Sequence, residues 1–551
     1  MSAKQVFKFA LTFLLFTVTN PWLQAKELWV YAQVNLLVPQ EVNRLLGLME
    51  RAQKVGYTHF LLADSKFSRL AELDRRYFDH IEQVKKRAQE LKLTLVPAIC
   101  SVGYSNDILS QNPNLAEGLP VRDSKYQVQS GFAHCVSELE MGLPGVADRK
   151  KWNFIDESLV LEGNNLHSKS PHSPNVRLSK RLTLKPNRHY HVSVKVKTQD
   201  FDAALEIKAL TANGRNLNYT NLGTKPTQDW QEHHVTFNSL DHTDVSLYIG
   251  AWGPQQGEVW ISDPKIEECG AVNLLRREMT PISVYQITEK GERKTLRENV
   301  DFEKWIDPKL GNVPYAGEYE AWHSPPPIKL KKPLPNGTEL RVSYYHAHIV
   351  YDGQVCAAAN DQEFQNLLDD QIARMTRLFP TADFMMSHDE YRVMGWTDSN
   401  ILSLPPGSTP ADILTHNVKH CSEQIRSHNT AARILVWSDM FDPYHNAVDQ
   451  YYLVNGSLKG SEVPRDVMIV NWNFGKRAES SKHFAQQGHL QLIAGYYDAQ
   501  PNEITRWLDT VVEQKINTVE GVMYTTWKRN YADLEEFARI AKSHDWYTKG
   551  L

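Results

Sequence analysis

Two acidic residues stand side by side in the stretch FMMSHDEYRVMGW, which runs from Phe384 to Trp396. A short apolar run leads to His388, and Asp389 and Glu390 follow directly. Neighbouring residues on a strand point to opposite faces, so this pair is badly placed to flank one bond symmetrically. The pair suits a division of labour, in which Glu390 protonates a leaving oxygen while Asp389 holds a group of the substrate itself.

Substrate-assisted glycoside hydrolysis needs this division. In that reaction the nucleophile belongs to the substrate, whose 2-acetamido carbonyl attacks the anomeric carbon. We therefore predict that Glu390 is the general acid and that Asp389 orients the acetamido N–H and stabilises its developing charge. The negative charge of Asp389 would also favour the protonated form of Glu390, which a general acid requires.

Polar or aromatic residues follow the other strand-like stretches as well. They are Asp64, Trp437, Asp439, Trp472, Tyr496, Asp498 and Trp527. The carboxyl ends of the strands of a parallel barrel converge on one face, where active sites are built. Each residue alone could simply cap the following helix, but together they predict a bowl of carboxylates walled by aromatic rings, which suits a sugar. His388 next to Asp389 lacks a third suitably spaced ligand, so we expect no metal and no cofactor.

The elements that would position these residues alternate between strand and helix. Strands are predicted at 28–33, 58–64 and 94–100, with helices at 39–56 and about 72–93 between them. The same rhythm resumes after residue 339 and continues to the C-terminus. This pattern is typical of an α/β fold, and eight such units predict a (β/α)8 TIM barrel. The stretch RVSYYHAHI, residues 341–349, is a ninth candidate strand that belongs either to the barrel or to an insertion.

Short alternating stretches replace helical periodicity in the middle of the chain, which is typical of an antiparallel sandwich. The predicted organisation is a first barrel part at 26–145, an inserted jelly-roll-like β-sandwich at 150–270, a further β-rich insert at 271–338, and a second barrel part at 339–551. Residues 1–25 combine Lys4 and Lys8 with an apolar run and end at a small residue. They read as a signal peptide, so we expect a secreted or periplasmic protein with no membrane span after cleavage.

Composition limits the partners. The 551 residues carry a formal net charge of −4, which argues against a nucleic-acid groove. The 14 Trp and 23 Tyr supply flat rings that can stack on sugars. An oligosaccharide or polysaccharide is therefore the expected partner.

The order of these motifs resembles glycoside hydrolase family 20, the β-N-acetylhexosaminidases. The matching pieces are RLFP at a helix end, HDE with Trp396, ILVWSDM, IVNWN, AGYYD and MYTTW. The resemblance implies that Asp389 assists the acetamido group, that Glu390 is the acid and that Tyr496 donates to the acetamido oxygen. It implies that Asp498 binds a hydroxyl and that Trp437, Trp472 and Trp527 wall the pocket. The inserted sandwich resembles a carbohydrate-binding module, although a purely structural insert would fit the sequence equally.

The chain also departs from this family. Met386 and Ser387 replace the glycines before the acidic pair, and Lys528 and Arg529 follow Trp527 where the family has an acid. Arg529 could meet a sulfate or uronate on the substrate, or could simply begin a solvated helix. We predict an exo-acting hexosaminidase. The alternatives are a barrel hydrolase for other or anionic sugars with its own nucleophile, such as Asp439 or Asp498, and a glycan-binding protein without activity.

Overall fold

The computed structural model describes residues 26–169, 173–351, 353–397, 404–405 and 407–549. Eight parallel strands close into a barrel in the order β1-β2-β3-β19-β21-β23-β24-β25. Their bounds are β1 Glu27–Gln33, β2 His59–Ala63, β3 Thr94–Ile99, β19 Phe384–Met386, β21 Ile434–Trp437, β23 Val467–Asn471, β24 Gln491–Tyr496 and β25 Val519–Thr525. The predicted TIM-barrel fold class is confirmed. The signal peptide predicted at 1–25 lies outside the described residues.

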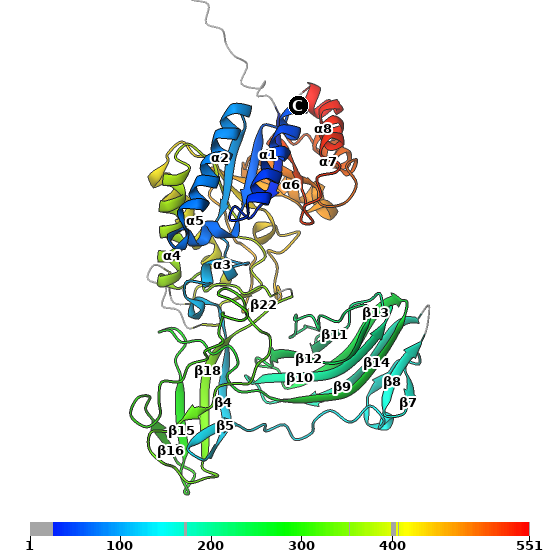
Figure 1. The fold of residues 1–551 in the computed structure, drawn as a ribbon, viewed down its shortest axis with the longest axis vertical. Helices are drawn as coiled ribbons and strands as arrows, with labels where there is room; N and C mark the ends of the chain where they lie inside the picture. The colour runs from blue at the N-terminus through cyan, green and yellow to red at the C-terminus, as the bar shows by residue number, and fades with distance from the viewer. Residues whose placement is uncertain (1–25, 170–172, 352, 398–403, 406, 550–551) are drawn as a thin grey trace, which may run out of the picture.

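Helices surround the barrel (Figure 1). They are α1 Pro39–Lys54, α2 Arg75–Leu91, α4 Gln362–Leu378, α5 Pro410–His428, α6 Arg477–Gln487, α7 Glu503–Glu513, α8 Leu534–Ser543 and α9 Asp545–Lys549. The short helix α3 Asn106–Leu109 follows β3 in the chain. In α1, Val42, Leu45 and Met49 are buried at helical spacing against the sheet. Helix α5 begins with a capping box between Thr409 and Asp412. Local sequence therefore fixes both the packed face and the start of these helices.

Apolar side chains fill the barrel interior. Its core cluster includes Trp29, Leu61, Val96, Met385 and Leu435, which are all buried. Side chains from alternate strands form layers inside a TIM barrel, so the interior is packed and not a pore. The floor of any cavity at the carboxyl ends of the strands is therefore built on a solid core.

The predicted β-sandwich is present as two antiparallel sheets. One has the order β12-β10-β14-β8-β7 and the other β11-β13-β9-β6. The bounds are β6 Phe154–Ile155, β7 Val160–Glu162, β8 Asn165–Lys169, β9 Ser173–Thr183, β10 His189–Gln199, β11 Glu206–Thr211, β12 Gln228–Asn238, β13 Asp244–Gln255 and β14 Glu258–Glu268. Alternate residues of β10, such as Tyr190 and Val192, contribute to its core.

A third, six-stranded sheet has the order β16-β15-β18-β4-β5-β17. Its strands are β4 Gly118–Gln129, β5 Phe132–Cys135, β15 Ser283–Ile287, β16 Arg293–Leu296, β17 Ile328–Lys329 and β18 Glu339–Ala347. The ninth candidate strand is thus β18, and it belongs to the insertion. The sheet extends past the insert predicted at 271–338 on both sides, because β18 pairs antiparallel with β4 from the segment assigned to the first barrel part.

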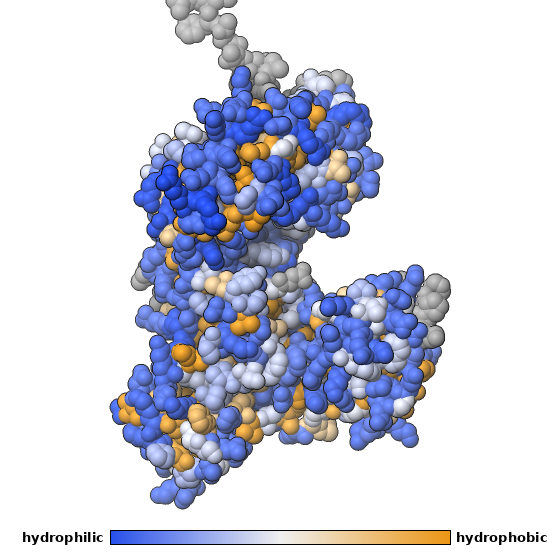
Figure 2. All heavy atoms as spheres, in the orientation of Figure 1, coloured by the Kyte–Doolittle hydropathy of each residue, from blue (hydrophilic) through white to orange (hydrophobic). Residues whose placement is uncertain are grey.

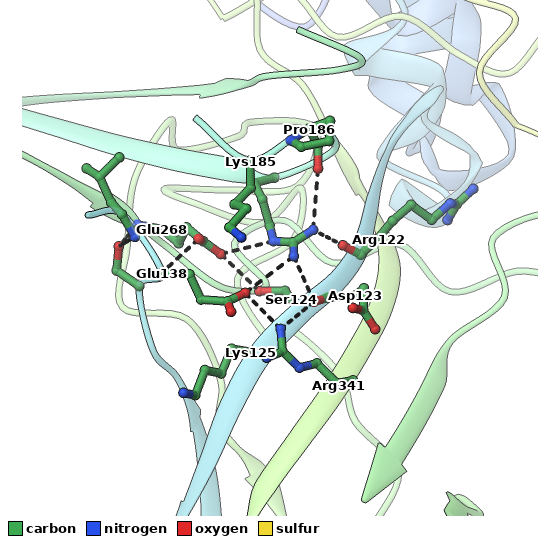
Figure 3. A network of polar contacts seen from close by, with 12 residues as sticks. Arg122, Asp123, Ser124, Lys125, Glu138, Lys185, Pro186, Glu268 and Arg341 are labelled. Atoms are coloured by element: carbon green, nitrogen blue, oxygen red, sulfur yellow. Dashed lines mark hydrogen bonds and ion pairs between the residues drawn. The ribbon is translucent and has the colours of Figure 1, made fainter. Parts of the chain in front are cut away.

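A buried arginine, Arg188, joins the sandwich to this sheet. Figure 3 labels the residues around it, among them Arg122, Glu138 and Glu268. Arg188, just before β10, donates to the carbonyl oxygens of Arg122 and Asp123, the latter at 2.9 Å. Its guanidinium also meets the carboxylates of Glu138 at 3.4 Å and Glu268 at 3.3 Å. One cation therefore ties the turn between β9 and β10 to β4, and fixes this end of the sandwich relative to the six-stranded sheet.

The barrel lies at one end of the molecule, with the sandwich and the six-stranded sheet beyond the carboxyl ends of its strands (Figure 1). The surface is hollowed between the barrel and the sandwich (Figure 2). The short parallel pair β20 Val393–Met394 and β22 Leu453–Val454 stands between the two parts. Loops that leave the barrel after β19 and β21 therefore reach the sandwich. No helix in the described residues is both long and apolar enough to cross a bilayer.

Candidate active site

A cavity of about 880 Å³ lies at the carboxyl ends of the barrel strands. Residues from all eight barrel strands or their following loops line it. Those with polar or aromatic side chains are Tyr31, Gln33, Asn35, Asp64, Ser65, Ser68, Ser101, Tyr104, Asp107, Ser387, Asp389, Glu390, Trp437, Asp439, Trp472, Tyr497, Trp527 and Arg529. The convergence predicted from strand ends is thus observed.

Five aromatic rings form one side of the cavity. Tyr31 meets the rings of Trp437 and Trp527 edge-on, with centroids 5.9 and 5.1 Å apart. Trp472 stacks on Tyr497 at 5.3 Å with an angle of 3° between the planes. Trp527 is 42% exposed, so its ring is available to a ligand at the rim. Rings of this kind can cover the apolar C–H face of a sugar.

The acidic pair lies in a loop and not on a strand. Strand β19 ends at Met386, and His388 has a left-handed backbone with φ of 39°. This break in the strand period is why both Asp389 and Glu390 line the cavity, whereas adjacent strand residues would have diverged. The backbone of Gly103 presses against the pair: a methyl group there would lie 2.1 Å from the carbonyl oxygen of Asp389. Gly103 therefore sets how closely the loop after β3 approaches the acids.

Asp389 is the less solvated of the two. Its Oδ1 is buried and has no hydrogen-bond partner among the described residues. Burial raises the pKa of Asp389 to about 6, and the nearby charge of Glu390 adds to the effect. Asp389 thus changes charge close to neutral pH and has an oxygen free to accept a ligand's N–H.

Glu390 has a cationic partner that the sequence analysis did not name. Its Oε2 lies 2.6 Å from Nη2 of Arg392 and accepts a hydrogen bond of 3.0 Å from the hydroxyl of Tyr104. Gln354 donates to the main-chain carbonyls of Gly103 and Glu390, at 3.0 and 2.8 Å, and accepts from Arg392. Glu390 therefore contacts a guanidinium as well as following the acidic residue Asp389 in the chain.

Asp439 is the carboxyl group with the strongest tendency to stay protonated. It is buried at the start of η4 Asp439–Phe441, and it accepts from Nε1 of Trp472 at 3.2 Å and from Nδ2 of Asn446 at 3.0 Å. Burial raises its pKa to about 7, and the charges of Glu390 and Asp389 contribute. The pKa values of Asp389 and Asp439 are thus both raised, chiefly by burial and in part by neighbouring carboxylates.

Of the residues predicted from sequence, the structure brings eight together around the cavity. They are Asp64, Asp389, Glu390, Trp437, Asp439, Trp472, Trp527 and Arg529. Two of these have their polar atoms engaged elsewhere. Asp64 accepts from Leu36 N, Lys66 N and the Tyr77 hydroxyl, so it caps the helix η1 Ser65–Glu72. Arg529 donates to Glu41 at 2.6 Å, which neutralises the cation expected to meet an anionic substituent.

Four predicted residues lie outside the cavity lining. Tyr496 is buried, stacks on Tyr524 at 4.2 Å and donates to Asp533. Asp498 accepts from the backbone N–H of Trp527 at 2.6 Å, so it holds the loop after β25.

His388 and Trp396 are likewise engaged away from the cavity. His388 is fully buried, with Nε2 2.9 Å from Asn417. The indole of Trp396 donates to the Leu453 carbonyl. The cause common to Tyr496 and Asp498 is the backbone, because residues 496 to 498 all have positive φ and the strand alternation fails there.

Tyr497 takes the place in the cavity that was expected for Tyr496. Three other lining or supporting residues were missed as site residues: Tyr31, Tyr104 and Arg392. A signal existed for Tyr31, which lies on β1 before the predicted strand end, and for Arg392, which is two residues from Glu390. Tyr104 had none, because it follows β3 in a loop. Within the described residues there is no group of three or more His, Cys, Asp or Glu side chains arranged to hold a metal.

Comparison with known proteins gives matches among solved structures alone. No family model and no curated protein matches the chain. It is similar to the β-N-acetylhexosaminidase of Bacteroides fragilis NCTC 9343, at 9% identity and a TM-score of 0.37, over 94% of this chain and 66% of that one. It is similar to the chitobiase of Flavobacterium johnsoniae, at 8% identity and a TM-score of 0.35, over 94% of this chain and 47% of that one.

A glycoside hydrolase family 20 β-N-acetylglucosaminidase matches at 6% identity and a TM-score of 0.36, over 96% of this chain and 72% of that one. The chain thus spans less than two thirds of the first two proteins. The similar solved structures include a member of glycoside hydrolase family 20, the family that the chain's own motifs also resemble.

Proposed function

We propose that the protein is a glycoside hydrolase that removes a terminal 2-acetamido sugar, with the substrate's acetamido carbonyl as the nucleophile. The observation that carries the proposal is the pair Asp389 and Glu390 in an aromatic-walled cavity at the carboxyl end of the barrel. Asp389 combines a raised pKa with an unpartnered oxygen. A buried acceptor without a partner is costly, and an acetamido N–H would satisfy it.

In the first step the acetamido oxygen forms a bond to the anomeric carbon as the glycosidic bond breaks. Asp389 accepts the acetamido N–H and stabilises the positive charge of the oxazolinium ion, while Glu390 gives its proton to the leaving oxygen. In the second step Glu390 takes a proton from water, which attacks the same carbon and reopens the ring. The two displacements retain the anomeric configuration.

Glu390 must carry a proton in the first step. Burial raises the pKa of Asp439 to about 7, so this carboxyl group can hold a proton at neutral pH. We infer that substrate binding separates Glu390 from Arg392 and that Asp439 supplies the proton that Glu390 donates. Trp437, Trp472, Tyr497 and Trp527 then cover the sugar ring. The cavity of about 880 Å³ suits one terminal residue and its aglycone, which favours exo action on exported oligosaccharide or polysaccharide.

Chromogenic glycosides test this function. We expect turnover of 2-acetamido glycosides by the wild type, and a large loss in Asp389→Asn and Glu390→Gln. An activated phenol can leave without being protonated. The rate loss in Glu390→Gln should therefore be smaller with activated phenyl glycosides than with poorer leaving groups, whereas the loss in Asp389→Asn should be the same with both. Equal turnover by wild type and both variants would refute the assignment.

One observation favours a second candidate, a barrel hydrolase with its own nucleophile. Glu390 is paired with Arg392 while burial raises the pKa of Asp439 to about 7, so these two could act as nucleophile and acid on a sugar without an acetamido group. A thiazoline mimic of the cyclised intermediate separates the two candidates. Strong inhibition supports the first, and turnover of 2-hydroxy glycosides without such inhibition supports the second.

A further inference from the structure

The segment after β11 of the sandwich, residues 212–222, reaches the barrel next to the acidic pair. We call it the docking loop. Arg215 in this loop donates from Nε and Nη2 to the carbonyl oxygen of Tyr452, at 3.0 and 2.7 Å, and from Nη2 to that of Val454 at 3.2 Å. Thr220 donates to the Ile349 carbonyl at 3.2 Å. The loop is thus bound both to the segment around β22 and to the segment between β18 and α4.

Tyr219 of the docking loop packs on two barrel tyrosines. Its ring centroid lies 4.5 Å from that of Tyr452 and 6.0 Å from that of Tyr351. The backbone N–H of Tyr351 donates to the Tyr219 carbonyl at 2.8 Å. Tyr351 and Tyr452 each have a positive φ of 43°, which a residue with a side chain adopts at a cost. Contacts from the docking loop therefore hold both tyrosines in an unfavourable backbone conformation.

These two tyrosines surround the partner of Glu390. The Arg392 guanidinium lies over the rings of Tyr452 at 5.0 Å, Tyr351 at 5.3 Å and Tyr104 at 5.6 Å. We call these three rings the tyrosine cage. Cation–π contacts are strongest where the cation is shielded from water, as this buried guanidinium is, so the cage helps to hold Arg392 in place. Arg392 in turn decides where the carboxylate of Glu390 rests, 2.6 Å away.

We propose that the docking loop of the sandwich is a positioning element of the active site, which acts through the tyrosine cage and Arg392 on Glu390. Arg215 and Tyr219 are then positioning residues, because they touch neither the cavity nor the acids. The kinetic part of this inference rests on the proposed function.

The anchoring of the sandwich supports this role. Arg188 fixes the turn between β9 and β10 to β4, at the same end of the sandwich as the docking loop, because Thr183 and Thr211 pair with the neighbouring residues Asp244 and Val245 of β13. This end of the sandwich is thus bound both to β4 and to the residues that surround Arg392. Such an attachment suits a part that maintains the geometry of the site.

Four variants of the whole chain test the inference: Arg215→Ala, Arg215→Lys, Tyr219→Leu and Thr220→Val. Thr220→Val is the matched control, because it removes a docking hydrogen bond that does not reach the cage. We expect Arg215→Ala and Tyr219→Leu to lower kcat about tenfold to a hundredfold with little change in KM, since a small misplacement of a catalytic group costs this much. Arg215→Lys should restore most of the rate, and Thr220→Val should keep the wild-type rate.

A second readout identifies the route. If Arg215 acts through Arg392, then Arg215→Ala should cause no further loss in an Arg392→Met background. Additive losses, or equal losses in Thr220→Val and Arg215→Ala, would overturn the inference.

Amide hydrogen exchange keeps this test separate from the proposed function. Without any substrate, Arg215→Ala should speed exchange in peptides covering 350–355 and 390–395, while peptides of the barrel strands keep wild-type protection. If no glycoside is turned over but these peptides respond, the coupling stands and the proposed function fails. If neither segment responds, the coupling is wrong whatever the enzyme hydrolyses.

Discussion

Gly103→Ala offers a sharp test of how the acidic pair is positioned. The added methyl carbon would lie 2.1 Å from the carbonyl oxygen of Asp389, 2.8 Å from that of Glu390 and 2.9 Å from the Asp389 carbonyl carbon. Non-bonded carbon and oxygen atoms need about 3.2 Å or more, so the two loops must separate by roughly 1 Å. All three contacts are backbone atoms, which cannot rotate away as a side chain could.

A displacement of about 1 Å at a catalytic group can cost about a hundredfold in rate. We therefore expect Gly103→Ala to lower kcat/KM for 2-acetamido glycosides by about that factor. The protein should stay folded, because the affected loops lie at the surface end of a packed barrel. The assay is steady-state kinetics together with thermal unfolding.

Gly47→Ala is the control for this substitution. Gly47 lies within α1, and a methyl group there would meet nothing within 4 Å. Alanine is a better helix former, so the control should be neutral or slightly more stable, by up to about 1 kcal/mol. If Gly103→Ala kept kcat/KM within twofold of the wild type, the close approach would be irrelevant to the chemistry and the reasoning would fail.

Three further outcomes follow from the site and its surroundings. Wild-type Asp439, with a pKa of about 7, adds a negative charge beside Asp389 and Glu390 as the pH rises. We expect kcat/KM to fall above pH 7 in the wild type and to fall less in Asp439→Asn. An unchanged pH profile would contradict the raised pKa of Asp439. Tyr497→Ala should raise KM about tenfold by removing a wall of the cavity, whereas Tyr496→Phe should cost about 1 kcal/mol of stability and leave KM alone; the reverse pattern would restore Tyr496 to the site. Burial lowers the pKa of His346 from 6.5 to about 4 and that of His348 from 6.5 to about 3, so the unfolded chain binds more protons than the folded chain below pH 6.5. The free energy of unfolding should therefore fall by up to about 1.4 kcal/mol per group per pH unit as the pH is lowered towards 4. Urea unfolding should show a less steep fall in His348→Gln.

The barrel could be predicted because each of its units carries a local signal. Apolar stretches such as the one ending at Ala63 alternate with amphipathic helices such as α1, and both features are properties of neighbouring residues. The membership of β18 could not be predicted, since its alternation fits either sheet. Its antiparallel pairing with β4 joins residues more than 200 positions apart and depends on tertiary packing.

The site was predictable where a residue directly ends a strand, as with Trp437 and Asp439. The prediction failed where the backbone leaves regular strand geometry. Positive φ values at Tyr496 and Tyr497 exchange the directions of the two side chains, and no periodicity in the sequence indicates such a change.

Long-range contacts account for the remaining omissions. The ion pair of Glu390 with Arg392 depends on a cage that includes Tyr351 and Tyr452, and on a sandwich loop far away in the sequence. The surroundings of this ion pair were therefore beyond local reasoning.

A crystal structure with a thiazoline mimic of the cyclised intermediate tests the central claim most directly. The account predicts the bicyclic ring against Trp437 and Trp472, its nitrogen within hydrogen-bond distance of the Asp389 carboxyl group, and Glu390 moved from Arg392 towards the anomeric carbon. A mimic bound elsewhere, or an Asp389 turned away from it with Glu390 still paired to Arg392, would contradict the account.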